Sequence, residues 1–175
     1  MSFWDRKFAL IGTLELDSSE DPSFRKRADQ LLGLQKEWEN LKAGEGIMRP
    51  CNGLDIASPL SAAAAYGFEH IVQYMLVHGA LVNGLPQSNP MSFRGNLLIR
   101  AAKNGHKNVM RTLIEFGAEI NIRVPEYRWS TLLTEAAYSG SASAFEYLLD
   151  EVKVDTNVID GFGCTVVSGL YPVHD

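Results

Sequence analysis

Apolar residues return at helical spacing in short segments along this chain, and glycines separate the segments in a recurring order. Each copy of the order contains a pair of alanines and then a glycine, and the three glycines are Gly67, Gly105 and Gly140. Gly105 follows Gly67 by 38 residues, and Gly140 follows Gly105 by 35 residues. A unit that repeats at such an interval indicates a core assembled by stacking copies. The pattern therefore predicts a repeat architecture rather than one irregular sheet or bundle.

Each unit is predicted to contain two short helices joined by a turn. In the first unit Ser58 is a favourable helix cap and Pro59 suits the first helical position, so one helix begins there. Gly67 then turns the chain, a second helix starts near Glu69, and Gly79 ends it, because glycine accepts a left-handed backbone without steric cost. The side chains of this second helix that should face the core are Ile71, Val72, Met75 and Leu76.

The second unit keeps the same internal spacing, whereas the third departs from it. Twelve residues separate the turning glycine from the stopping glycine in the first two units, from Gly67 to Gly79 and from Gly105 to Gly117. At the corresponding place the third unit has Val152. Because valine does not favour the left-handed backbone of a helix stop, we expect a looser helix end there.

The alanine pairs explain how two helices of one unit can lie against each other. Antiparallel helices joined by a tight turn approach closely only where small side chains face each other. Larger apolar residues of each second helix then fill the space between neighbouring units. A substitution of Ala102 by leucine should therefore overpack its hairpin by roughly 1–3 kcal/mol. The pairs are Ala63-Ala64, Ala101-Ala102 and Ala136-Ala137.

A longer amphipathic segment precedes the first unit. Asp21-Pro22 is a favourable helix start and Gly44 a favourable stop. We expect the helix between them to cap the first repeat, because a terminal unit of a stack needs a polar outer side. Residues 1–20 are predicted to be an extended lead-in, and residues 1–51 together form an N-terminal region. The apolar face of the helix consists of Phe24, Ala28, Leu31, Leu34, Trp38 and Leu41.

A fourth unit opens near Asp160 and is cut short. After Thr165 only ten residues remain, and glycine and proline interrupt any helix among them. We expect a repeat domain over residues 52–167, an irregular tail over 168–175, and a shortened chain. The outer face of the third unit should be partly exposed, or covered by the apolar residues of this segment. Those residues are Val166, Val167, Leu170, Tyr171 and Val173.

The three units resemble the ankyrin repeat family. A family unit reads approximately Asp-x-x-Gly-x-Thr-Pro-Leu-His-x-Ala-Ala-x-x-Gly-His, then an apolar helix and Gly-Ala-Asp-Val-Asn. The resemblance implies an all-α fold, an ankyrin-type α-solenoid of three helix-turn-helix repeats plus a partial fourth, with an N-terminal capping helix. Besides the alanines and glycines, the matching segments are Ser58-Pro59-Leu60, Gly79-Ala80-Leu81-Val82-Asn83, Gly105-His106, Gly117-Ala118-Glu119-Ile120-Asn121 and, after a one-residue insertion, Asp155-Thr156-Asn157.

Two departures from the family pattern bear on the loops. The histidine of the Thr-Pro-Leu-His tetrad is replaced by Ser61, Ile99 and Thr134 in the three units. The hydrogen bonds that this histidine makes in the family are therefore not expected, and the turns should be less rigid. The connector over residues 85–95 is longer than the family norm, and a long loop on a rigid scaffold is a candidate contact element.

The resemblance implies a scaffold that binds a partner protein through finger loops, the connectors between units, and through first-helix positions just before each turning glycine. Tyr127-Arg128-Trp129 is the strongest candidate because tyrosine, tryptophan and arginine anchor interfaces disproportionately. The alternative for Trp129 is a core position under its finger. The first-helix positions are Ala65, Tyr66, Lys103, Asn104, Tyr138 and Ser139, and the finger positions are Ser92, Phe93, Tyr127, Arg128, Ser130 and Phe162.

Composition restricts the class of protein and its surroundings. An apolar fraction of 46% with 21% charged residues is typical of a globular domain. The net charge of −5 argues against a broad nucleic-acid-binding surface. Cys51 and Cys164 stand far apart and indicate neither a disulfide framework nor a zinc site. With no secretory signal or membrane-spanning run, we expect a cytoplasmic protein.

No residue pattern indicates catalysis, a cofactor or a metal. His70 and His78 are eight residues apart on one predicted helix, too far for joint metal ligation. No strand-turn-helix serine motif is present. Gly161-Phe162-Gly163 lacks the lysine of a phosphate loop. The interpretation is a noncatalytic adaptor.

Basic and acidic residues are distributed unevenly along the chain, and this distribution is compatible with several other functions. A solvated surface is the simplest interpretation, and an acidic partner segment beside the second unit is the alternative. The repeats could instead target a larger effector or enzyme, bind nucleic acid through the basic residues, or self-associate through the incomplete C-terminal repeat. The basic residues are Arg94, Arg100, Lys103, Lys107, Arg111, Arg123 and Arg128, and the acidic ones are Glu135, Glu146, Asp150, Glu151, Asp155 and Asp160.

Overall fold

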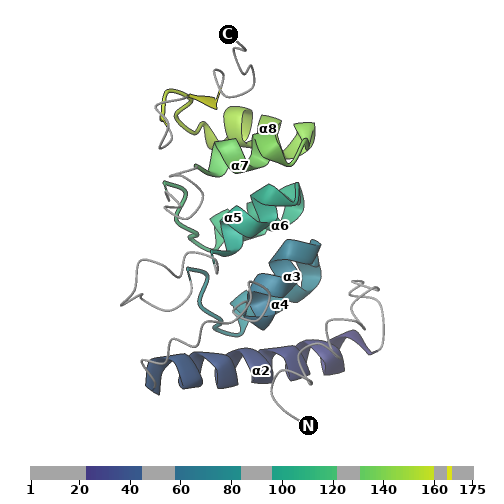
Figure 1. The fold of residues 1–175 in the computed structure, drawn as a ribbon. Coiled ribbons are helices and arrows are strands. Elements are labelled where there is room, and N and C mark those ends of the chain that lie inside the picture. Colours follow the sequence, from purple (N-terminus) through teal and green to yellow (C-terminus); the bar gives the residue numbers. More distant parts are fainter. Residues whose placement is uncertain (1–22, 45–57, 84–95, 122–130, 160–164, 167–175) are drawn as a thin grey trace.

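The structure of the protein, a computed structural model, describes residues 23–44, 58–83, 96–121, 131–159 and 165–166 (Figure 1). Within these ranges the regular elements are all helical, as the sequence predicts. In chain order they are α2 (Phe24–Gly44), α3 (Pro59–Tyr66), α4 (Glu69–Val77), α5 (Leu97–Lys103), α6 (Lys107–Glu115), α7 (Leu132–Tyr138), α8 (Ala142–Glu146) and the π-helix η3 (Tyr147–Val152).

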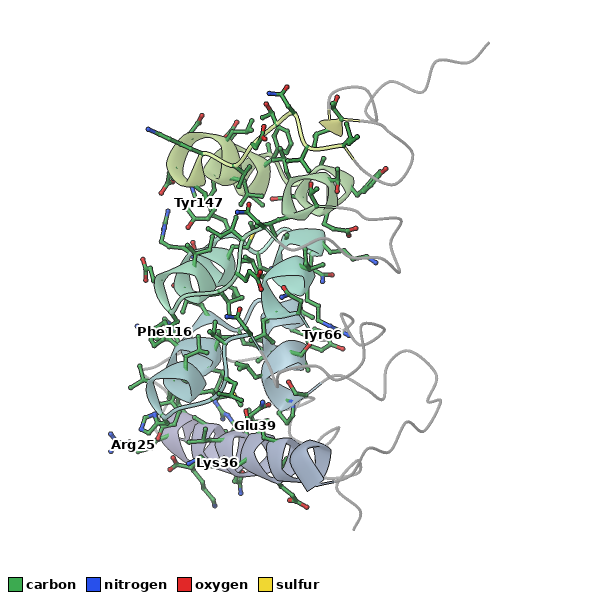
Figure 2. The ribbon with its side chains drawn as sticks, turned by 90° about the vertical axis from the view of Figure 1, so that its left-hand side faces the viewer. Arg25, Lys36, Glu39, Tyr66, Phe116 and Tyr147 are labelled. Atoms are coloured by element: carbon green, nitrogen blue, oxygen red, sulfur yellow. The ribbon has the colours of Figure 1, made fainter. Side chains whose placement is uncertain are left out.

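The helices form two columns that rise from α2, and Figure 2 shows these columns side by side. The first helices of the units, α3, α5 and α7, contact one another in one column. The second helices, α4, α6 and α8, do so in the other. Helix α2 packs across the lower end of both columns, against α3 and α4. The predicted stack of three hairpins with a terminal capping helix is therefore confirmed for the described part of the chain.

Polar side chains cap the first helix of every unit. Ser58 accepts a hydrogen bond from the backbone N–H of Ser61, and Asn96 accepts one from that of Ile99. In the third unit Thr131 and Thr134 form a reciprocal capping box, so the position of the family's histidine is used for capping. Each cap satisfies one N–H that the helix leaves unpaired.

The alanine pairs belong to the core. Ala63, Ala64, Ala101, Ala102 and Ala136 are fully buried and Ala137 is partly buried, and the two helices of each unit contact each other. Their small side chains leave room for long apolar residues from both columns. The largest fully buried apolar side chains are Leu31, Leu60, Ile71, Met75, Leu98, Met110, Leu113 and Leu148.

Two turning glycines are required for contact between units as well as for backbone conformation. Gly67 and Gly105 have φ angles of 80° and 74°, in the left-handed region. A Cβ atom at Gly67 would lie 2.6 Å from Nδ1 of His106, and one at Gly105 would lie 2.6 Å from Cβ of Ser141. The residue that follows each turn thus packs on the glycine of the preceding unit.

The third unit absorbs its inserted residue inside the second helix. The chain continues from α8 into η3, in which the wider turn of a π-helix accommodates one extra residue. The left-handed position that ends this helix is Lys153, with φ 57°, instead of a glycine. This helix therefore ends at a lysine after a π-helical turn, and the expectation that the end is looser stays a prediction.

Helix α2 takes the place of a preceding repeat at the start of the stack. Ala28, Leu31 and Leu34 are buried, as predicted, and the buried Gln35 accepts a hydrogen bond from the N–H of Leu60 at 3.1 Å. That N–H belongs to the first turn of α3, which has no partner within its own helix. The same Gln35 donates to Glu39. The capping helix thus contributes hydrogen bonds as well as apolar surface.

At the other end of the stack, Val166 is buried and belongs to the core. It is one of the residues expected to cover the third unit. The other four, Val167 and its successors, lie outside the described residues.

Candidate protein-interaction surface

The six first-helix positions predicted to contact a partner form two rows along one column. Each lies one or two residues before a turning glycine, and α3, α5 and α7 are neighbours in the column. We call these residues the first-helix ladder, and they are Ala65, Tyr66, Lys103, Asn104, Tyr138 and Ser139. The structure thus brings together six residues that are spread over more than seventy positions of sequence.

Two tyrosines dominate the exposed area of the first-helix ladder. The exposed fraction of Tyr66 is 62% and that of Tyr138 is 73%. Lys103 and Asn104, from the repeat between them, are exposed as well. Large aromatic side chains in water offer apolar area that a partner can bury at little rotamer cost.

The ring of Tyr66 lies against another aromatic ring. It stacks on Phe68, with 5.9 Å between the ring centroids and 29° between the planes. Because Phe68 packs against the core, this contact holds Tyr66 in place before any partner arrives. Figure 2 labels Tyr66 on the first-helix column, whereas Phe116 lies on the second-helix column.

Two polar members of the first-helix ladder serve the ends of their own helices. Nδ2 of Asn104 donates to the carbonyl oxygen of Arg100 at 2.8 Å. The hydroxyl of Ser139 donates to the carbonyl oxygen of Ala136 at 2.6 Å and accepts from the N–H of Ser141. The bond from Ser139 pairs a carbonyl group at the C-terminal end of α7, whereas the carbonyl oxygen of Arg100 accepts from the backbone N–H of Asn104 as well, at 3.3 Å. The two side chains therefore reinforce the turns next to Lys103 and Tyr138.

The finger positions fall outside the described residues. This applies to Ser92, Phe93, Tyr127, Arg128, Trp129, Ser130 and Phe162, and to the whole connector over residues 85–95. The assignment of these residues to a partner stays a prediction from the family resemblance.

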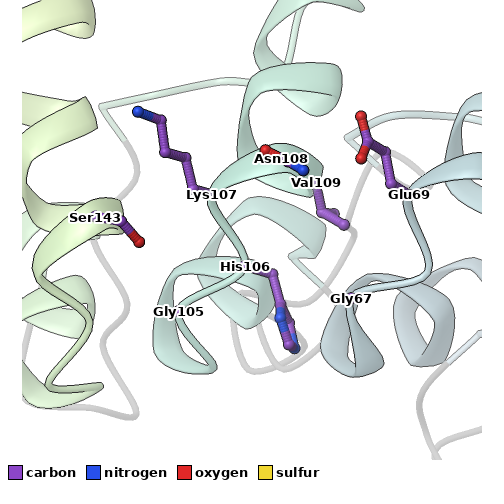
Figure 3. A pocket seen from close by; sticks show the side chains of 8 residues that line it. All are labelled: Gly67, Glu69, Gly105, His106, Lys107, Asn108, Val109 and Ser143. Carbon is purple, nitrogen blue, oxygen red and sulfur yellow. The ribbon is translucent and has the colours of Figure 1, made fainter.

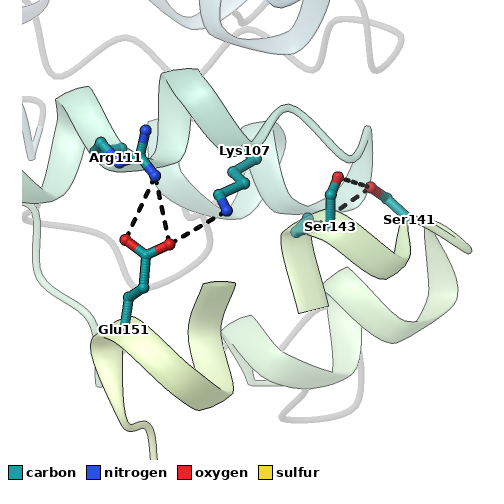
Figure 4. Close-up of polar contacts among 6 residues, drawn as sticks. Lys107, Arg111, Ser141, Ser143 and Glu151 are labelled. Atoms are coloured by element: carbon teal, nitrogen blue, oxygen red, sulfur yellow. Dashed lines mark hydrogen bonds and ion pairs between the residues drawn. The ribbon is translucent and has the colours of Figure 1, made fainter. Parts of the chain in front are cut away.

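The basic and acidic residues of repeats two and three meet on the second-helix column (Figure 4). Nζ of Lys107 lies 3.2 Å from a carboxylate oxygen of Glu151, and Nη2 of Arg111 lies 3.4 Å from the other. Both cations also lie over the ring of Tyr147, about 5.5 Å from its centroid. We call Lys107, Arg111, Tyr147 and Glu151 the charged clasp. Two of the listed basic residues are thus paired inside the chain.

The charged clasp changes the acidity of two of its members. The hydrogen bond from Lys107 is the main cause that lowers the pKa of Glu151, and Arg111 lowers it further. Burial is the main cause that raises the pKa of Tyr147, although Arg111 opposes the change. Sequence reasoning listed Lys107, Arg111 and Glu151 but placed no contact among them. The sequence does contain one indication of this cluster. Lys107 and Arg111 are four residues apart, so their side chains lie one helical turn apart on the same side of α6.

A shallow depression of about 250 Å³ lies at the turn end of the stack (Figure 3). Gly67, Gly105 and His106 line it, with Glu69 on one side and Lys107 and Ser143 on the other. Within the described ranges, no three His, Cys, Asp or Glu side chains gather as a metal site requires. The depression therefore lies between side chains of opposite charge, those of Glu69 and Lys107.

Two histidines have structural contacts. His106 lies between the first and second repeats, where its Nε2 is 2.9 Å from the carbonyl oxygen of Ala65. His78 stacks on Tyr74 with 4.0 Å between ring centroids, and its Nδ1 is 2.7 Å from the carbonyl oxygen of Tyr74. His106 thus joins two repeats, whereas the contacts of His78 are local to the end of α4.

A family model for ankyrin repeats, in three copies, matches residues 39–124 and 60–160, more than half of the chain. The chain belongs to the ankyrin repeat family. Ankyrin repeats are generally protein–protein interaction modules. A search of curated proteins finds no match to this ankyrin repeat chain. Among its described helices, none has both the length and the apolar composition to span a bilayer.

Proposed function

We propose that this ankyrin repeat chain is a noncatalytic, cytoplasmic scaffold that holds a partner protein on the first-helix ladder and through its finger loops. The observation that carries the proposal is the pair of exposed tyrosines, Tyr66 and Tyr138, on equivalent helix ends of the same column. Isolated exposed aromatics are common, but two at the same end of one column of helices supply the kind of anchors that interfaces use.

The charged clasp argues against the alternative of nucleic-acid binding. Lys107 and Arg111 already share the carboxylate of Glu151. A phosphate backbone would compete with that carboxylate for both cations. Binding to nucleic acid would also fall steeply with added salt, so a retention measurement over a salt series distinguishes the two functions.

The proposal is tested by identifying a captured partner and then measuring its affinity for matched variants. Replacing Tyr66 and Tyr138 together by alanine should reduce the free energy of binding by about 2–4 kcal/mol, because each substitution removes an interface anchor. This corresponds to an affinity that is lower by roughly thirtyfold or more. A Tyr127→Ala/Arg128→Ala variant tests the finger contribution in the same assay.

The control replaces two exposed apolar residues of the second-helix column. Val77 and Phe116 have exposed fractions of 63% and 38%, so their replacement by alanine removes exposed apolar surface away from the first-helix ladder. Affinity unchanged in the tyrosine variant, or lost equally in the control, would reject the assignment.

A further inference from the structure

The turn between α5 and α6 contains an asparagine followed by a glycine, and the structure describes both residues. The side chain of Asn104 is exposed to solvent. Its Nδ2 donates a hydrogen bond to the carbonyl oxygen of Arg100 at 2.8 Å. The backbone N–H of Gly105 donates to the carbonyl oxygen of Ala102 at 3.0 Å. The side-chain amide and the backbone nitrogen that follows it are thus both bonded to the end of α5.

An asparagine that is followed by glycine can lose its side-chain amide without an enzyme. The backbone nitrogen of the glycine attacks Cγ of the asparagine, a C–N bond forms, and the proton of that nitrogen leaves with the ammonia. Water then opens the cyclic imide at either carbonyl and gives aspartate or isoaspartate. One water is consumed and one ammonia is released, and no oxidant is needed. Glycine favours the attack because it has no Cβ to obstruct it.

The backbone conformation of Asn104 keeps the attacking nitrogen away from the carbon that it would attack. The ψ angle of Asn104 is 4°, so the nitrogen of Gly105 eclipses the backbone nitrogen of Asn104 rather than its Cβ. Closure of the five-membered imide ring requires that the nitrogen of Gly105 eclipse Cβ instead. This needs a rotation of ψ by roughly a third of a turn, because the nitrogen and Cβ are tetrahedral substituents of Cα. The folded turn therefore does not allow the reaction.

The third repeat holds this turn in its folded conformation. The carbonyl oxygen of Gly105 accepts a hydrogen bond from the hydroxyl of Ser141 at 3.3 Å. A Cβ atom at Gly105 would lie 2.6 Å from Cβ of Ser141, so the backbone of the turn is in close contact with the third repeat. Rotation of ψ at Asn104 would move Gly105 and break its hydrogen bonds. The rotation therefore requires that the turn separate from the third repeat.

We infer that Asn104 is a deamidation site that is protected in the folded stack and reacts when the turn after α5 separates from the third repeat. In the folded stack the hydrogen bonds of the turn keep Cγ of Asn104 and the nitrogen of Gly105 apart. When the turn separates, ψ of Asn104 rotates freely, and the pair reacts as it does in an unfolded chain. The fraction of deamidated chains therefore records how often this boundary between repeats has opened.

The product cannot form the same turn. In aspartate an oxygen replaces Nδ2, so the side chain and the carbonyl oxygen of Arg100 are two acceptors that face each other. The new negative charge also lies at the C-terminal end of α5, where the helix dipole disfavours it. Isoaspartate in addition places one more carbon atom in the main chain before Gly105. Each reaction should therefore weaken the contact between repeats two and three.

Peptide mass spectrometry of the full chain in mildly alkaline buffer measures the reaction, and the same chain in concentrated urea is the reference. We expect Asn104 to react at least about tenfold more slowly in the native chain, since the reaction there requires opening. Isoaspartate should be part of the product in both conditions, because the cyclic imide opens at either carbonyl. Equal rates in the two conditions, or aspartate as the sole product, would overturn the inference.

Two variants that each remove one helix cap locate the protecting boundary. Ser141→Ala removes the cap of α8 together with the hydrogen bond to Gly105, whereas Ser58→Ala removes the cap of α3 in the first repeat. We expect Ser141→Ala to accelerate the reaction at Asn104 severalfold and Ser58→Ala to leave its rate unchanged. Equal acceleration by both variants would show that the reaction proceeds through unfolding of the whole chain, and this result would contradict the inference.

The effect of the product is tested with Asn104→Asp, which carries the side chain of one product. The matched control is Asn108→Asp, because Asn108 is also exposed and lies in the first turn of α6, where the helix dipole favours a negative charge. We expect a lower urea midpoint for Asn104→Asp and no decrease for Asn108→Asp. A midpoint of Asn104→Asp equal to that of the original chain would contradict the weakening of the boundary by deamidation.

Discussion

At the scale of single residues, glycine acts in two different ways in this chain. Gly105 combines a left-handed backbone with close contact to Ser141. Gly33, on the exposed side of α2, has no atom within 4 Å of the place where a Cβ would lie. Gly105 is required for the packing of neighbouring repeats. Gly33 only increases the conformational entropy of the unfolded chain.

The two glycines predict opposite results of the same substitution. Gly105→Ala should lower the free energy of unfolding by about 1–3 kcal/mol through backbone strain and overpacking. Gly33→Ala should raise it by about 0.5–1 kcal/mol. Urea unfolding of both variants measures this, and a stable Gly105→Ala chain would show that the turn tolerates a side chain.

The buried polar side chain of Gln35 is also expected to contribute to stability by itself. Gln35→Met keeps the length of the side chain but leaves the N–H of Leu60 without its acceptor, which should destabilise the chain by about 1–3 kcal/mol. Gln30, exposed on the same helix, provides the control, because Gln30→Met should change stability by less than about 0.5 kcal/mol. Thermal unfolding of both variants is the measurement, and equal midpoints would contradict a role for this hydrogen bond.

At the scale of helices, most of the structure follows from local sequence. The caps at Ser58, Asn96 and Thr131 and the left-handed glycines are set by residues close to them in the chain. For the first repeat the sequence predicts the helix ends from Ser58, Gly67 and Gly79, whereas the caps at Asn96 and Thr131 were not predicted. The π-helix η3 does not follow in this way. An inserted residue can be absorbed in a loop or in a helix, and the local sequence does not select between the two; in the structure Tyr147 and Leu148 of this helix are buried in the core.

The charged clasp joins helices of two repeats and makes their contact depend on pH. Because the pKa of Glu151 is lowered in the folded chain, folding favours the carboxylate. The stabilisation is complete above the ordinary pKa of a glutamate and is lost as the pH falls through the lowered value. It should be small, since the exposed fraction of the Glu151 side chain is 51%.

Glu151→Gln tests this dependence. Its urea midpoint should lie below that of the original chain at neutral pH, and the difference should shrink as the solution is acidified below about pH 4. Added salt should shrink it as well, by screening. A difference that grows on acidification would contradict the assignment of the pKa shift to Lys107 and Arg111.

At the scale of the whole molecule, stacking converts short local motifs into an extended surface. The order of the repeats along the column brings Lys103 and Tyr138 to equivalent places, with Tyr66 at the same end of the column in the neighbouring row, and the sequence predicts this because equivalent positions of stacked units are neighbours. Contacts that cross units through unrelated side chains, such as Gln35 with Leu60 and Asn83 with Gly117, depend on the placement of whole helices. The local sequence pattern therefore does not predict these contacts.

The central claim, that a partner protein lies on the first-helix ladder, is tested most directly by hydrogen exchange of the chain with and without its captured partner. We predict slower exchange in the complex for the amides around Gly67, Gly105 and Gly140, next to the ladder. The ends of α4 and α6 near Gly79 and Gly117 should be unaffected. A footprint confined to those second-helix ends, with the first-helix turns unchanged, would contradict the account.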